Sequence, residues 1–226
     1  MAYQLRENLS FCRVDDGLIF LDLDADRYFR LTVPLEAAFL DYLQGEGHRT
    51  DGIESLVRHN LLIAVDDTAH RLSESLPPRP SESALELLCV RDATASFAVL
   101  EVFATVCYVQ LQLKIGRISR LLATIAGYRD RTATKQPVRH SSDLDAELLR
   151  AVHMFRRSRP YVPIDTCCLL DSTSLIAFLA RRRISASLVF GVTNRPFAAH
   201  CWAQREGWVL NDTVGNALAH TPIRTI

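Results

Sequence analysis

A segment rich in proline and serine divides this sequence in two, and the division constrains the fold more than any other feature. Residues 73–83 read SESLPPRPSES and hold three prolines and four serines. Proline and small polar residues form extended connections that bury little apolar surface. The sequence therefore predicts two domains, residues 1–75 and residues 84–226, joined by a linker at residues 76–83.

The two parts differ in charge. Residues 1–80 carry 14 acidic and 8 basic side chains, whereas residues 81–226 carry 12 acidic and 18 basic side chains. Opposite charge balances favour different partners for the two domains. The basic residues are scattered among apolar ones and do not alternate with aromatic residues, which argues against nucleic-acid binding.

The N-terminal residues and the cysteines indicate a reducing compartment. The first residues, MAYQLRENLSF, carry charges where a secretory signal has its apolar segment, so we expect a cytoplasmic protein. Its six cysteines should then remain reduced. The sequence has no Cys-x-x-Cys pair and no His/Cys cluster with zinc spacing, so we expect no metal site.

The front part is typical of a small α+β domain, with strands first and helices after them. Apolar residues alternate on both sides of the turn residues DADR, and proline opens a helical pattern that glycine ends. The expected elements are a strand at 3–14, a hairpin within 11–33, helices at 34–45 and 51–60, and a strand or helix end at 61–65.

The back part is also α+β, with helices before antiparallel strands. The expected elements are helical structure over 84–126, a polar loop over 127–147, a helix at 145–157, an extended approach at 157–166, a helix at 168–183, strands at 184–193, 198–205 and 207–212, and a tail at 216–223, with a turn from 191 to 197.

One apolar stretch of the back part resembles a membrane span. Residues 95–113 are mostly apolar, but Glu101 and two glutamines interrupt them. We interpret this stretch as a buried or partner-facing helix. The basic stretch 114–122 that follows fits a solvated face, with weak contact to a membrane surface as the alternative.

Three polar residues of the back part occupy positions from which they can converge. Cys168 begins a predicted helix, where backbone dipoles lower a thiol pKa and free N–H groups can stabilise an oxyanion. His200 lies in a strand and could pair with the thiolate. Asp212 ends the next strand and could fix the tautomer of the imidazole. Together they predict a Cys-His-Asp catalytic triad.

Other interpretations of these residues stay open at this point. Cys167 is a competing nucleophile, although it precedes the helix. Cys201 follows His200 directly, and because neighbours in a strand point to opposite faces, we predict that Cys201 packs inward as a small apolar residue. Each triad residue taken singly is more commonly structural: a histidine in a strand, an aspartate in a turn, a cysteine in a core.

The residues around this constellation resemble the transglutaminase-like cysteine peptidase of lasso peptide biosynthesis, the B protein. The matching positions are Cys168-Leu169, Gly191-Val192, Pro196-Phe197, Ala199-His200, Trp202 and Asp212. Asp171 departs from the basic residue and the alanines expected after the nucleophile, and Cys201 stands where a small residue such as alanine is usual. If Asp171 points inward, it would raise the pKa of the thiol.

The front part resembles the PqqD-like peptide-recognition domain of the same family, a winged helix-turn-helix, in DGLIFLDLDADRYFRL followed by PLEAAFLDYL. The resemblance implies a leader peptidase with a papain-like or transglutaminase-like fold. It would bind the leader of a ribosomally made precursor peptide and cut the leader–core bond. The implied partner is an asparagine-synthetase-like cyclase, which uses ATP, whereas this chain would need no cofactor.

By this resemblance, the leader would add as a strand to a sheet edge that faces the helix at 51–60. The edge residues would be Tyr28, Phe29, Arg30 and Leu31, which otherwise simply build the domain core. Two other functions remain: a non-catalytic adaptor that presents the precursor to the cyclase, and a transglutaminase-like enzyme that transfers the acyl group to an amine.

Overall fold

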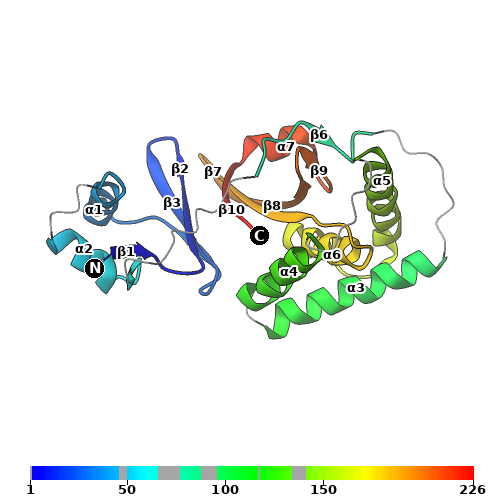
Figure 1. Cartoon of the computed structure of the whole chain (residues 1–226), viewed down its shortest axis with the longest axis horizontal. Coiled ribbons are helices and arrows are strands. Elements are labelled where there is room, and N and C mark those ends of the chain that lie inside the picture. Colours follow the sequence, from blue (N-terminus) through cyan, green and yellow to red (C-terminus); the bar gives the residue numbers. More distant parts are fainter. Residues whose placement is uncertain (1, 46–49, 66–76, 88–95, 117, 134–140) are drawn as a thin grey trace. The chain divides into compact units, whose positions relative to one another are not determined.

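The computed structural model describes residues 2–45, 50–65, 77–87, 96–116, 118–133 and 141–226. The chain divides into two compact units, Met1–Ser75 and Leu76–Ile226. Each unit contains both helices and strands (Figure 1), so the predicted mixture of helix and sheet is confirmed.

The first unit combines two small antiparallel sheets with helices. Its elements are β1 (Ala2–Leu5) paired with β5 (Leu62–Val65), a sheet of β2 (Leu9–Val14), β3 (Gly17–Asp22) and β4 (Arg27–Phe29), and the helices α1 (Val33–Leu43) and α2 (Thr50–Arg58). The predicted single strand at 3–14 is wrong. Asn8 has a φ of 62°, in the left-handed region, and this turn separates β1 from β2.

Aromatic side chains form the core of the first unit. Phe20 is fully buried, and its ring centroid lies 5.1 Å from that of Phe39 and 5.3 Å from that of Phe29. Phe20 lies in the predicted hairpin, which the structure contains as β3 and β4. Pro34 lies in the first turn of α1, as the sequence predicts.

The second unit is built on a five-stranded sheet in the order β10-β7-β8-β9-β6. The strands are β6 (Glu82–Ser83), β7 (Ser187–Asn194), β8 (Phe197–Arg205), β9 (Trp208–Val209) and β10 (Thr221–Thr225). β6 pairs in parallel with β9, and Ser83 is buried. The predicted linker is therefore wrong at its C-terminal end, because residues 82–83 belong to the sheet. The strand β7 also continues to Asn194, beyond the predicted start of the turn.

Helices cover this sheet. They are α3 (Ser96–Ile115), α4 (Ile118–Ala133), α5 (Ser141–Ser158), the short 3-10 helix η1 (Arg159–Tyr161), α6 (Cys168–Arg181) and α7 (Val214–Ala219). α6 packs against β8 and also against α3, α4 and α5, so it lies between the sheet and the outer helices (Figure 1). Phe178 and Leu179 in α6 are accordingly fully buried. This burial holds the start of α6 in place.

Several predicted elements of the second unit are wrong. The helical region does not include residues 84–87, and the predicted loop at 127–147 contains the end of α4 and the start of α5, with residues 134–140 outside the described residues. Polar composition alone does not distinguish a loop from a polar helical segment. The predicted tail contains α7, which the Thr213 side chain caps by accepting a hydrogen bond from the Asn216 N–H at 3.1 Å, followed by β10.

Gly191 in β7 lets two aromatic residues approach the backbone. A Cβ atom at this position would lie 2.8 Å from the Trp202 ring and 2.9 Å from the Cβ of His220. Gly191 also pairs in register with His200 across β7 and β8. Gly191 is therefore required because the Trp202 and His220 side chains lie close to its Cα. Its backbone angle φ is one that other residues can also adopt.

We predict that Gly191→Ala lowers the free energy of unfolding by about 1–3 kcal/mol, because the added methyl group overpacks the site. Denaturant unfolding followed by circular dichroism measures the change. Gly215→Ala is the matched control: no atom lies within 4 Å of a Cβ there, so this variant should keep or slightly raise the stability. Equal stability of the two variants would contradict the steric argument.

Candidate active site

The open edge of β8 brings the predicted site residues together. β9 pairs with β8 at Gln204 and Arg205, and the ladder ends near Ala203, whose carbonyl accepts the Leu210 N–H at 2.9 Å. Beyond that point, the edge of β8 that faces away from β7 needs another partner for its backbone groups. The first turn of α6 and residues 211–212 supply that partner.

A short hydrogen-bond network ties α6 to this edge. The Asn211 side chain accepts the Ala203 N–H at 2.7 Å and donates to the Ser172 hydroxyl at 2.8 Å. The Ser172 hydroxyl in turn donates to the Cys201 carbonyl at 3.2 Å. Because Ser172 lies in the first turns of α6, the network fixes the start of the helix against the strand.

Cys168 is the first residue of α6 and receives hydrogen bonds from β8. Its thiolate accepts them from the Cys201 thiol, from the His200 ring and from the Cys201 backbone N–H, and together they lower the pKa of Cys168 to about 4, although burial opposes the shift. Cys167, the N-cap residue, gives no side-chain cap. The free N–H groups of the first turn therefore add a field that favours an anion here.

His200 bridges the sulfur and a carboxylate. Its Nε2 lies 2.5 Å from Oδ2 of Asp212, which leaves Nδ1 for the thiolate. The hydrogen bond with Asp212, followed by the one with Cys168, raises the pKa of His200 to about 9. At neutral pH the pair is therefore a thiolate and an imidazolium.

Asp212 stays ionised because several donors surround it. Burial raises its pKa, but hydrogen bonds from His200, the Thr213 N–H and the Asn216 amide outweigh burial and hold the pKa below its usual range. The backbone carbonyl of Asp212 is held separately by the Ser83 hydroxyl at 2.5 Å. Ser83 belongs to the segment that the sequence predicted as linker.

Sequence reasoning missed Asn216. Its side-chain amide donates to Oδ2 of Asp212 at 2.7 Å and lies 3.3 Å from Nε2 of His200. It lies on α7, which the sequence predicted only as part of a tail. A Thr-x-x-Asn sequence directly after the aspartate was the available signal, since threonine is a frequent helix N-cap.

The predicted inward charge at Asp171 is compensated. Its Oδ1 accepts a hydrogen bond from Nε of Arg159 at 2.7 Å, and none of the interactions that set the pKa of Cys168 involves Asp171. Arg159 also donates to the carbonyls of Ile164 and Asp165. Sequence reasoning missed Arg159, which fixes the approach to the nucleophile.

Cys201 is buried, as predicted, but it also contacts the nucleophile. It is 3% exposed, and the hydrogen bond to Cys168, together with burial, raises the pKa of the Cys201 thiol well above its usual range. Cys201 is therefore a neutral donor. Both Cys201 and its neighbour His200 can reach the sulfur because Cys168 lies at the edge of the strand, between the two faces.

The predicted leader-binding residues lie at an edge of the first unit. β4 is the outer strand of its three-stranded sheet, and Tyr28 and Phe29 pair with β3. Phe29 and Leu31 pack against the apolar core, Tyr28 is half-buried and Arg30 is exposed. The structure thus makes Phe29 and Leu31 part of the core, and it places β4 at the end of its sheet.

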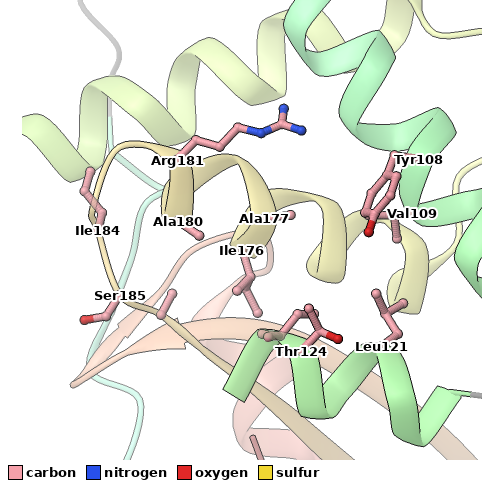
Figure 2. Close-up of a pocket in the computed structure, with 12 residues that line it drawn as sticks. Tyr108, Val109, Leu121, Thr124, Ile176, Ala177, Ala180, Arg181, Ile184 and Ser185 are labelled. Carbon is pink, nitrogen blue, oxygen red and sulfur yellow. The ribbon is translucent and has the colours of Figure 1, made fainter. Parts of the chain in front are cut away.

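An apolar pocket lies away from this site. It has a volume of about 190 Å³ and lies between α3, α4 and the C-terminal half of α6. In Figure 2 the pocket is lined by Tyr108 and Val109 of α3, by Leu121 and Thr124 of α4, and by Ile176 of α6. Cys168 is at the opposite end of α6, so this pocket does not contain the candidate catalytic residues.

One family of known sequences matches most of the second unit. Residues 109–225, more than half of the chain, match the sequence model of the transglutaminase-like superfamily. The match includes Cys168, His200 and Asp212. The searches of curated proteins and of solved structures gave no match. Among the described residues, no group of histidine, cysteine and acidic side chains could hold a metal ion.

We predict that Cys201→Ala raises the pKa of Cys168 by about one to two pH units, because a hydrogen bond to a charged group contributes about 1.5–3 kcal/mol. The measurement is the pH dependence of iodoacetamide alkylation at Cys168, followed by peptide mass spectrometry. Both proteins should carry Cys167→Ala, because the exposed Cys167 thiol lies on the same peptide. An unchanged alkylation profile would show that the Cys201 thiol does not stabilise the thiolate.

Proposed function

Because the chain belongs to the transglutaminase-like superfamily, we propose that it is a cysteine peptidase that removes the leader from a ribosomally made precursor of the lasso peptide class. The superfamily includes cysteine peptidases and transglutaminases. The observation that carries the proposal is the thiolate–imidazolium pair of Cys168 and His200, backed by Asp212.

The first half-reaction forms a thioester. The Cys168 sulfur attacks the carbonyl carbon of the leader–core bond, and the free N–H groups at the start of α6 stabilise the oxyanion. The His200 imidazolium then donates its proton to the leaving nitrogen, which becomes the amine of the core peptide. Asp212 holds the ring in position during the transfer.

The second half-reaction regenerates the enzyme. Neutral His200 accepts a proton from water, the water oxygen attacks the thioester carbon, and the leader leaves with a carboxylate. If an amine replaces water at this step, the enzyme transfers the acyl group instead. The same three residues support both reactions, so the acceptor distinguishes a peptidase from a transglutaminase.

The first unit would bind the leader. β4 is an end strand of its sheet, so an extended peptide could add beside it, and Arg30 is exposed next to this strand. A PqqD-like winged helix-turn-helix function for this unit rests on the sequence resemblance in the hairpin and the helix after it. The freed core would pass to an ATP-dependent cyclase in the cytoplasm.

We predict that Cys168→Ala abolishes cleavage of the precursor peptide while the variant still binds it. His200→Ala should lower the rate at least about 10³-fold, since the proton donor is lost. The assay uses a synthetic lasso-class precursor peptide that contains a leader and a core, with cleavage followed by mass spectrometry and binding by fluorescence anisotropy. Cys167→Ala is the control and should keep activity.

The outcomes separate the alternatives. Cleavage that survives Cys168→Ala would exclude Cys168 as the nucleophile. If the unmodified protein binds the precursor but does not cleave it, even when the cyclase is present, the protein is an adaptor. Incorporation of a primary amine probe at the leader C-terminus would indicate acyl transfer.

We also predict a bell-shaped pH profile for cleavage. Activity falls as the pH falls through the pKa of Cys168, about 4, because the thiolate is protonated, and falls as the pH rises through the pKa of His200, about 9, because the proton donor is lost. Initial rates at sub-saturating precursor measure the profile. A rate that rises continuously from pH 6 to pH 9 would show that the resting nucleophile is a neutral thiol.

A further inference from the structure

The outer face of α3 carries a continuous row of exposed apolar side chains. Phe97, Leu100, Phe103, Tyr108, Leu111 and Ile115 are 42–79% exposed. Phe103 lies to one side, and the other five together with Ala104 recur at intervals of three and four residues, which places them on one face of the helix over its full length. Such a row on a soluble surface marks an interaction site.

The inner face of α3 is fixed to the domain. Val102 and Val106 are fully buried, Glu101 forms an ion pair with Arg182 at 2.6 Å, and Thr105 accepts a hydrogen bond from Arg181 at 2.5 Å. Figure 1 shows α3 as a long helix at the outside of the second unit. By length and composition, Phe97–Ile115 is the one described helix that could span a membrane. The charged and polar contacts with α6 oppose its removal from the domain.

We propose that two copies of this chain associate through the exposed face of α3, with the helices antiparallel about a twofold axis. In this arrangement Phe97 of one copy lies opposite Ile115 of the other, and Leu100 lies beside Leu111. The small Ala104 lies opposite the large Tyr108, so a protruding ring meets a space at the centre of the interface.

Charge favours the antiparallel arrangement. From Phe97 to Ile115, Lys114 is the one charged residue with an exposed side chain. Antiparallel helices place the two Lys114 side chains at opposite ends and align the helix dipoles favourably, whereas parallel helices would bring them together. A membrane surface is a weaker fit, since helices that bind it carry many basic residues beside the apolar face.

The available area fits a specific dimer. The five exposed side chains on this face offer on the order of 600 Å² per copy, given the size of large apolar residues and their exposure. Standard interfaces bury about 800 Å² per partner. Tyr108 also lines the apolar pocket between α3, α4 and α6 (Figure 2), which extends the apolar surface beyond the helix.

The first test is the mass of the full chain in solution, independent of any peptidase activity. Light scattering after size exclusion should give a dimer at micromolar concentrations. Leu100→Glu with Leu111→Glu should raise the dissociation constant about 100-fold or more, because these two positions face each other across the apolar interface and the substitutions bury like charges there. Val33→Glu is the control: Val33 is 83% exposed at the start of α1, and this variant should remain dimeric.

The second test fixes the orientation. Phe97→Cys with Ile115→Cys in one chain should give a disulfide-linked dimer under mild oxidation, whereas either substitution alone should not. A linked dimer from Phe97→Cys alone would show parallel helices and overturn the arrangement. A monomeric full chain would overturn the proposal, as would a chain that binds liposomes through the same face without dimerising.

Discussion

The early end of the ladder between β8 and β9 is the feature on which the candidate site depends. β9 has two residues, and beyond Ala203 the β8 edge bonds to side chains in place of a strand. Asn211 competes successfully for the Ala203 N–H because its amide oxygen mimics a backbone carbonyl. A longer β9 would occupy this edge and exclude the start of α6. Because β9 ends early, the Cys168 sulfur can accept hydrogen bonds from both His200 and Cys201, which are neighbours in β8.

The fold around the site follows from the sequence where a local pattern is strong. The positions of the strands β7 and β8, the apolar spacing in α6 and the position of Cys168 at its start were all predicted correctly. The predicted strand at 207–212 is too long, because β9 contains only Trp208 and Val209. Asn and Asp are common where strands end, so Asn211 and Asp212 do not reveal at which residue the pairing with β8 stops. The outcome depends on Ser172, which is 39 residues from Asn211 in the sequence.

Contacts made by single side chains explain the rest of what sequence reasoning could not find. Arg159 looks like any basic residue near a proline, yet its guanidinium orders the residues before the nucleophile. Ser83 lies in a segment whose composition indicates a linker, yet it holds the Asp212 carbonyl across 129 residues. Neither set of contacts leaves a periodic signal, since each depends on a single side chain that donates to backbone carbonyls. The triad itself was accessible because its chemistry restricts the residue types.

The two departures from the resembled pattern act on the same charge. Asp171 introduces a carboxylate into the first turn of α6, where it would oppose a thiolate one turn away, and Arg159 neutralises it by an ion pair that is mostly buried. Cys201 adds a thiol donor where alanine could offer none. The Cys168 thiolate therefore has a neutralised carboxylate one turn away and receives hydrogen bonds from Cys201. Since Cys201 is far harder to ionise than Cys168, the two thiols cannot exchange roles, and Cys168 at the helix start is the candidate nucleophile.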